Sequence, residues 1–248
     1  MNLASSQNSP FHPAAIQLEH SFFTVPAECP YGQPCPATYR LARFDEITVT
    51  AMEFLLGSGY RRNGNVLYTM QCQGCNGCTP IRLRPSAFSP NRNQKRVLKK
   101  NRGITAEIAP PRMEDSNLAL LEKFLAARYP QPTSSADGYY SAFFLNTLCN
   151  TMTVDYRIHN TLVGTSIIDI GDNWLNAVYC YFDPDLHKHS LGTYNILYLV
   201  DLCRRNAIEY LYLGYWIHNV RAMCYKANFK PNEILINGEW KANQQPLS

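Results

Sequence analysis

Three short runs in the second half of the chain restrict its fold more than any other feature. Residues 152–158, 162–170 and 174–182 are rich in β-branched and aromatic residues, and only the turns His159-Asn160 and Gly171-Asp172-Asn173 separate them. Turns this short join neighbouring antiparallel strands, so the runs predict a three-stranded meander. The pattern then predicts a helix over 191–206, a buried strand over 210–213, a helix over 220–228 and a strand over 233–236.

This order of elements is that of N-acyltransferase domains of the acetyltransferase-like (GNAT-type) kind. It is an analogy of fold alone, and it makes acyl transfer to an amine a candidate activity. Because 248 residues exceed the usual size of one domain, we expect an α+β protein in two parts. Residues 1–20 are expected to form a flexible tail, 21–106 a smaller cysteine-containing α/β part, and 107–248 the acetyltransferase-like domain.

The first half of the chain gives weaker local patterns. Residues 26–36 contain four Pro residues and predict an ordered loop. Residues 66–70 and 81–84 predict strands, whereas 45–56 fit a helix or a strand. Helices are predicted over 89–103, 114–130 and 139–148, with a polar loop over 131–138.

Positive charge is concentrated in one stretch of the chain. Residues 54–106 contain ten Lys and Arg residues and no Asp or Glu, although the formal net charge of the whole chain is only +4. The predicted strand at 81–84 alternates apolar and basic residues and is expected to turn its guanidinium groups outward. A solvated helix face usually mixes charges of both signs, so this composition favours a track that contacts RNA phosphates. The residues of this predicted track are Arg82, Arg84, Arg92, Gln94, Lys95, Arg96, Lys99, Lys100 and Arg102.

The nine cysteines are an odd number, and residues 1–13 lack the apolar stretch of a secretory leader. Reduced thiols in the cytoplasm are therefore expected. Cys72, Cys75 and Cys78 offer three sulfurs, whereas a tetrahedral zinc or an iron–sulfur cluster needs a fourth ligand. Cys29 or Cys35 would supply it only if its loop folds back. We expect a structural loop of reduced thiols and assign no metal.

Two further segments could take part in chemistry. Asp183, Ser190 and Gly192 lie where a predicted strand meets a helix N-terminus, a place where free N–H groups accept an anion or polarise a carbonyl. A purely structural helix cap fits the same residues. Tyr212, Tyr215 and Trp216 end a predicted strand, where they either line a cleft for an adenine or an aminoacyl side chain or pack in the core.

Several motifs, taken in order, resemble the leucyl/arginyl-tRNA-protein transferase family, and its bacterial aspartate/glutamate leucyltransferase branch in particular. In the first half they are Cys-Pro-Tyr at 29–31, the three-cysteine run at 72–78 followed by Pro80 and Arg82, and Phe-Ser-Pro-Asn-Arg-Asn-Gln-Lys-Arg at 88–96. In the second half they are Phe-Asp-Pro at 182–184, Ser-Leu-Gly-Thr-Tyr at 190–194, Tyr-Leu-Gly-Tyr-Trp-Ile at 212–217 and Met-x-Tyr-Lys-Ala-x-Phe-x-Pro at 223–231.

The resemblance implies an aminoacyl transfer. The α-amine of a protein that begins with Asp or Glu attacks the ester of an aminoacyl-tRNA. Leucyl-tRNA is the expected donor in preference to arginyl-tRNA, and the product is marked for degradation by the N-end rule pathway. Aminoacyl-tRNA is the cosubstrate, and neither another cofactor nor a membrane is expected. Such chemistry depends on positioning and proton removal. Asp183 is the expected proton acceptor or ammonium ligand, and the turn at Ser190 and Gly192 is expected to steady the oxyanion.

An acidic first residue on the acceptor requires cations to bind it, and Arg40, Arg82 and Lys226 are the candidates. The expected pocket for the aminoacyl group and the acceptor consists of Tyr31, Arg40, Tyr212, Tyr215, Trp216 and Lys226. Two other functions fit the same sequence: a coenzyme A-dependent N-acetyltransferase, and a non-catalytic RNA-binding protein.

Overall fold

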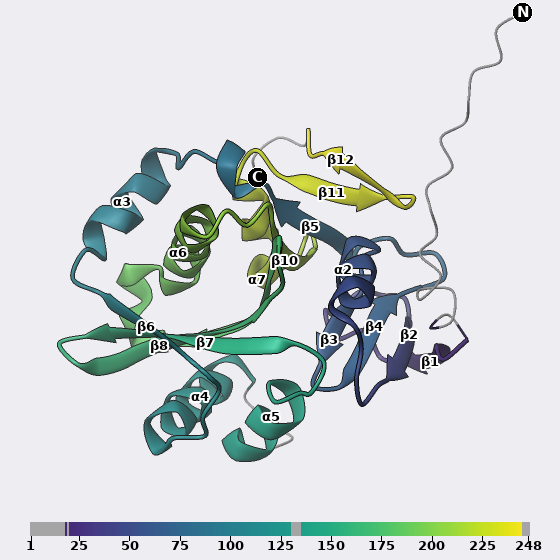
Figure 1. Cartoon of the computed structure of the whole chain (residues 1–248), viewed down its shortest axis with the longest axis horizontal. Coiled ribbons are helices and arrows are strands. Elements are labelled where there is room, and N and C mark those ends of the chain that lie inside the picture. The colour runs from purple at the N-terminus through teal and green to yellow at the C-terminus, as the bar shows by residue number, and fades with distance from the viewer. Residues whose placement is uncertain (1–17, 19, 130–134, 245–248) are drawn as a thin grey trace, which may run out of the picture.

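The computed structural model describes residue 18 and residues 20–129 and 135–244, which form two sheets (Figure 1). The smaller sheet is antiparallel, with strand order β1-β2-β4-β3. Its strands are β1 (Phe23–Ala27), β2 (Ala37–Arg43), β3 (Arg61–Asn63) and β4 (Val66–Met70), and helix α2 (Val49–Gly57) connects β2 to β3. Thr48 caps α2, because its side chain accepts a hydrogen bond from the backbone N–H of Ala51.

The larger sheet has eight strands in the order β12-β11-β5-β10-β9-β8-β7-β6. Strand β10 pairs with β9 in parallel, and the other pairings are antiparallel. The strands are β5 (Thr79–Leu83), β6 (Thr105–Ala109), β7 (Asn150–Ile158), β8 (Thr161–Ile170), β9 (Trp174–Phe182), β10 (Tyr210–Trp216), β11 (Glu233–Ile236) and β12 (Glu239–Ala242).

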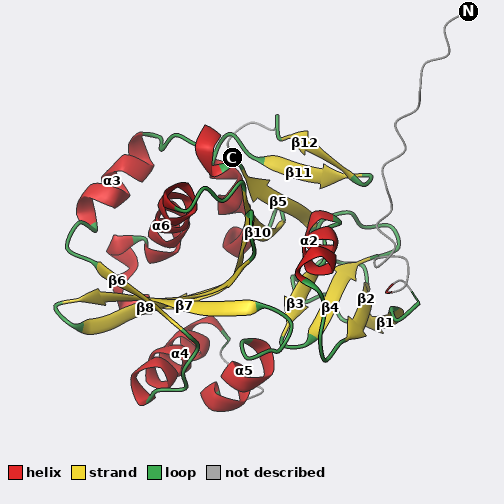
Figure 2. Cartoon of the chain, in the orientation of Figure 1, coloured by secondary structure: helices red, strands yellow, loops and turns green. Residues whose placement is uncertain are grey.

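Helices cover both faces of the larger sheet (Figure 2). Helix α6 (Leu191–Arg205) packs on one face, and α3 (Arg92–Lys100) lies beside it. Helices α4 (Asp115–Arg128) and α5 (Ala136–Phe143) cover the other face, where Leu121 and Phe144 pack against Ile167 and Tyr181. The remaining helical segments are the short α7 (Arg221–Cys224) and the 3-10 turns η1 (Pro85–Ala87), η2 (Pro184–His189) and η3 (Tyr225–Asn228).

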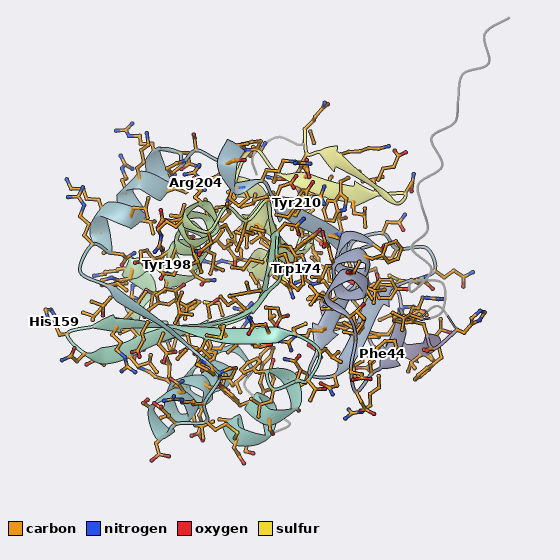
Figure 3. The ribbon with its side chains drawn as sticks, in the orientation of Figure 1. Phe44, His159, Trp174, Tyr198, Arg204 and Tyr210 are labelled. Atoms are coloured by element: carbon orange, nitrogen blue, oxygen red, sulfur yellow. The ribbon has the colours of Figure 1, made fainter. Side chains whose placement is uncertain are left out.

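A third hydrophobic cluster joins the two sheets. Met52 and Leu56 of α2 and Leu67 of β4 pack there with Trp174 of β9 and Tyr212 of β10. Trp174 lies at the centre of the side-chain view, between the larger sheet and α2 (Figure 3). Because one core contains residues of both sheets, the smaller sheet holds a fixed place against β10.

The structure confirms the predicted α+β class and the predicted order of the C-terminal elements. The three β-rich runs are β7, β8 and β9 and form an antiparallel meander, followed by α6, β10 and β11. Two predicted helices were wrong in extent: α5 ends at Phe143, and the segment over 220–228 divides into α7 and η3. The ambiguous segment at 45–56 is helical from Val49, as part of α2, which ends at Gly57. No prediction was made for β1, β2, β3, β6 or β12.

The predicted division of the chain at residue 106 falls inside β6. The strands change sheet earlier, between Met70 at the end of β4 and Thr79 at the start of β5. The predicted tail over 1–20 lies outside the described residues, except for residues 18 and 20. So do residue 130, at the end of a predicted helix, and residues 131–134 of the predicted polar loop over 131–138. In the part of the chain that the structure describes, no helix is both long and apolar enough to cross a membrane.

Candidate functional site

Strand β10 contains an irregularity at Gly214. Its pairing register with β5 shifts between Tyr212 and Tyr215. Gly214 has a φ of +88°, a backbone conformation that residues other than glycine rarely adopt. A Cβ added to Gly214 would lie 2.8 Å from Nη2 of Arg61 and 3.4 Å from Nζ of Lys226. Two cationic groups from distant parts of the sequence therefore converge on the backbone of this glycine. We call Arg61 and Lys226 the cation pair.

Arg61 belongs to β3 and is 9% exposed. Burial lowers the pKa of its guanidinium, an effect that neighbouring Tyr68, Tyr215 and Tyr31 oppose. Its guanidinium carbon lies 6.0 Å from the centre of the Tyr215 ring. Among the described residues, no carboxylate lies within ion-pair distance of Arg61. A buried charge without such a partner is costly, so this arrangement requires an explanation.

Lys226 reaches the same place from η3. Its ammonium donates a hydrogen bond to the backbone oxygen of Tyr215 at 2.8 Å, and Sδ of Met223 lies 3.4 Å away. Burial lowers the pKa of Lys226 to about 7, and the positive charges of Arg61 and Arg128 contribute to the shift. The predicted acceptor residue Lys226 therefore lies in a cationic environment.

Tyrosines surround the cation pair. Burial raises the pKa of Tyr31 far above its usual value, and Tyr68 and Tyr215 add to this effect as close neighbours. The rings of Tyr68 and Tyr215 lie 6.4 Å apart, and the hydroxyl of Tyr215 donates to the backbone oxygen of Gly59 at 3.4 Å. Three residues predicted for the acceptor pocket, Tyr31, Tyr215 and Lys226, are thus brought together.

The other predicted pocket residues lie in different surroundings. Arg82 forms an ion pair with Glu233 at 2.7 Å, and its guanidinium carbon lies 4.0 Å from the ring centre of Tyr210 and 4.2 Å from that of Trp240. Arg40 donates to the Tyr60 hydroxyl at 3.0 Å. Tyr212 and Trp216 are buried in two of the hydrophobic clusters.

The predicted phosphate track divides into a buried and an exposed set. Arg82 and Arg84 were expected to point outward. This is wrong for Arg82, which is 8% exposed. Arg84 is partly exposed, but Glu233 and Glu209 bind its guanidinium. Gln94 is 4% exposed, because it completes the capping box of α3 with Asn91 and donates to the backbone oxygen of Asn228. Six residues of the track are exposed and form no ion pair with an acid in the described part of the chain. They are Arg92, Lys95, Arg96, Lys99, Lys100 and Arg102. We call this set the basic face of α3.

Asp183 follows β9 and caps η2. Its carboxylate accepts from the Lys123 ammonium at 2.6 Å and from the backbone N–H of Asp185 at 2.9 Å. Burial acts to raise the pKa of Asp183, but these two donors outweigh it and hold the pKa below its usual value. Ser190 begins α6 in the left-handed conformation, with φ 51°, and makes no side-chain cap. Gly192 lies against the ring of Phe182, 3.5 Å from the position of an added Cβ.

The cysteines of the N-terminal part lie close to one another. Burial raises the pKa of Cys78 to about 12, and the neighbouring thiols of Cys72, Cys29, Cys75 and Cys35 also raise it. Cys35 and Cys75 share a hydrogen bond. The loop over 29–35 therefore folds back as the fourth-ligand hypothesis required, yet no group of three or more His, Cys, Asp or Glu among the described residues has an arrangement that could hold a metal ion.

Arg61 and Gly214 were not among the predicted site residues. Arg61 and its neighbour Arg62 both lie in the stretch without acids, so the sequence does not distinguish them. The structure does, because Asp169 binds Arg62. The motif Tyr-Leu-Gly-Tyr-Trp-Ile contains Gly214 inside a predicted strand, and a glycine there is typical of a bulge or a close approach. The glycine inside the predicted strand was therefore the sequence feature that could have indicated this site.

Two family profiles agree with the motif resemblance. The profile described as "Arginine-tRNA-protein transferase, N terminus" matches residues 27–96, and that described as "Arginine-tRNA-protein transferase, C terminus" matches residues 116–236. A solved structure titled "The structure of L-PGS from Bacillus licheniformis" aligns with 79% of this chain and 72% of its own, with 9% identity and a TM-score of 0.45.

Relatives named aspartate/glutamate leucyltransferase match over most of their length. The protein from Thiobacillus denitrificans is 38% identical over 82% of this chain and 88% of its own. The protein from Methylobacillus flagellatus is 34% identical over 89% of this chain and 90% of its own. On these matches, the chain belongs to the leucyl/arginyl-tRNA-protein transferase family and falls among its bacterial aspartate/glutamate leucyltransferases.

Proposed function

We propose that this protein transfers leucine from leucyl-tRNA to the α-amine of proteins that begin with Asp or Glu, in the cytoplasm, and so marks them for degradation. The names of its relatives support the reaction and both substrates. The structural observation that carries the use of tRNA is the basic face of α3. Its six exposed cations have no acidic partners among the described residues, which suits a phosphate backbone.

The larger sheet supports an acetyltransferase-like arrangement for this transfer. Strand β9 pairs with β10 in parallel over Tyr210 to Tyr212, and α6 begins after β9 and η2. The N–H groups of Leu191 and Gly192 precede the first one that is bonded in this turn, that of Thr193 to the oxygen of Ser190, and they are the donors for the oxyanion or for a terminal phosphate of the tRNA.

The chemical step needs no nucleophilic side chain, because the α-amine attacks an ester that is already activated. The C–N bond forms, the C–O bond to the ribose breaks, and the proton of the amine passes to the departing ribose oxygen or to solvent. Asp183 is held as a carboxylate by Lys123, so we give it the role of fixing the turn that leads to Ser190. Its use as proton acceptor would require the Lys123 bond to open.

Purified protein given leucyl-tRNA or arginyl-tRNA, together with Asp-, Glu- and Ala-start peptides, tests this function by mass spectrometry. We expect addition of one leucine to the Asp- and Glu-start peptides and none to the Ala-start peptide. A parallel reaction with acetyl-coenzyme A in place of tRNA separates the two acyl donors. Acetylated peptide in that reaction, with no leucine transferred from tRNA, would exclude the proposal.

A further inference from the structure

We infer that Arg61 and Lys226 together bind the side-chain carboxylate of the acceptor's first residue and so select Asp and Glu. This inference rests on the proposed function and assigns its acceptor specificity to one place. The two cationic groups meet at Gly214, 2.8 and 3.4 Å from the point where a Cβ would stand. They come from β3 and η3, so only the folded chain brings them together.

The strongest argument for a bound anion is the contrast between two adjacent arginines. Arg62 donates to both carboxylate oxygens of Asp169, at 2.8 and 2.6 Å, and both side chains are fully buried. Arg61 is also buried, but it forms no ion pair with an acid in the described part of the chain: the charge of Asp169 reaches it only from a longer distance, and the ammonium of Lys226 lies at the same glycine. Two cations held close together without an anion repel each other, and a ligand carboxylate removes that repulsion.

The surroundings favour a carboxylate over a phosphate. Arg61 offers a planar fork of N–H donors and Lys226 a single ammonium, a combination that suits the two oxygens of a carboxylate. The tyrosines at 31, 68 and 215 are neighbours of Arg61, and their hydroxyl groups can donate further hydrogen bonds to a bound carboxylate. Phosphates have the separate, exposed basic face of α3.

The other predicted acceptor cations do not compete for this role. Arg82 is neutralised by Glu233 and enclosed by two aromatic rings, and Arg40 is engaged by the hydroxyl of Tyr60. Lys226 alone, of the three, lies beside a second buried cation. Acceptor specificity therefore depends on a partner, Arg61, that comes from the smaller sheet.

The test compares Glu-start and Gln-start peptides, which differ by the charge to be recognised, at saturating leucyl-tRNA. We expect the ratio of their kcat/KM values to fall by about 10- to 100-fold in Arg61→Met and in Lys226→Met, since each removes a charge-assisted hydrogen bond. The KM for leucyl-tRNA should stay unchanged in both variants. Arg43→Met, which removes an exposed arginine at the end of β2, is the control and should keep the wild-type ratio.

A second pair of variants tests the position without removing a charge. Gly214→Ala places a methyl group where the two cations converge, and it should reduce the Glu-to-Gln ratio as well. Gly238→Ala has a similar positive φ of +78° but no atom within 4 Å of the added Cβ, so it carries the backbone strain alone and should keep the ratio.

The outcomes separate this assignment from the proposed function. Wild-type protein that transfers leucine to neither peptide overturns the function, and the assignment with it. Wild-type protein that prefers the Glu-start peptide, with a preference that survives in Arg61→Met, Lys226→Met and Gly214→Ala, overturns the assignment and leaves the function standing.

Discussion

Arg62 and Asp169 form a bidentate ion pair between the two sheets, with donor–acceptor distances of 2.8 and 2.6 Å and no exposed side-chain surface on either residue. Asp169 also accepts from Thr151 and Asn176, so its carboxylate is fully engaged. The pair fixes β3 against β8. Because Arg61 is the neighbouring residue on β3, the same contact positions the cation pair at Gly214.

Asp169→Asn should therefore be strongly destabilising. It leaves the Arg62 guanidinium buried without a counter-charge, which typically costs about 3–5 kcal/mol of unfolding free energy. Urea denaturation measures this loss. Asp201→Asn is the control, since Asp201 forms an exposed pair with Arg205 one helical turn away, and it should change stability by at most about 0.5 kcal/mol. A loss for Asp169→Asn no larger than this control would show that the pair does not join the sheets.

Arg61→Met should have the opposite effect on stability. In the free protein it removes a buried charge that has no acidic partner among the described residues and that repels Lys226, and we expect a gain of about 1–2 kcal/mol. Thermal denaturation should show this as a rise of a few degrees in Tm, about 2–4 °C per kcal/mol for a chain of this size. A lower Tm would mean that the guanidinium stabilises the free fold, which contradicts a role in binding the acceptor at the expense of stability. The gain would accompany a loss of acceptor selectivity, as is common at binding sites.

Sequence patterns predicted those features that depend on near neighbours. The meander, α6 and the exposed cations of α3 follow from periodicity and local composition, and the structure agrees. The capping box of α3 is also a local feature, since Asn91 and Gln94 stand three residues apart. It was not predicted, and Gln94 was placed in the phosphate track instead.

The roles of the arginines could not be predicted in this way. The acids that bind Arg82 and Arg62 stand 151 and 107 residues away in the sequence, so nothing near either arginine indicates its partner. Strand β3 is only three residues long, too short to show the alternation that would send Arg61 and Arg62 to opposite faces. Which basic residues remain available for a ligand was therefore decided by tertiary contacts.

Acceptor selectivity should depend on pH through Lys226. The groups that face its ammonium are Arg61 from β3, Arg128 from α4 and the backbone oxygen of Tyr215. The pKa of Lys226 is lowered from 10.5 to about 7, so the free protein loses this charge as the pH rises through 7. The Glu-to-Gln ratio of kcat/KM should then fall by up to about tenfold between pH 6 and 8.

The peptide α-amine also titrates in this pH range, but it is common to both peptides, so its effect cancels in the ratio of their kcat/KM values. Lys226→Met should show a low ratio at every pH, because it has no group left to titrate. A wild-type ratio that stays constant from pH 6 to 8 would indicate that Lys226 keeps its proton, or that it does not contact the acceptor.

Binding of tRNA should be governed by the basic face of α3. The combined substitution Lys95→Ser, Lys99→Ser and Lys100→Ser removes three exposed cations, and each phosphate that is no longer neutralised should reduce the slope of log affinity against log salt by about 0.7–0.9. The slope should therefore become shallower by about 2–3, and the affinity for leucyl-tRNA should fall most at low salt. Filter binding at several salt concentrations measures both quantities.

Lys241→Ser, on β12, is the control, because Lys241 is exposed and paired with Glu239. An unchanged slope in the triple variant would place the tRNA phosphates on another surface, whereas a shallower slope with an unaltered Glu-to-Gln ratio would show that donor and acceptor are bound by separate sets of cations.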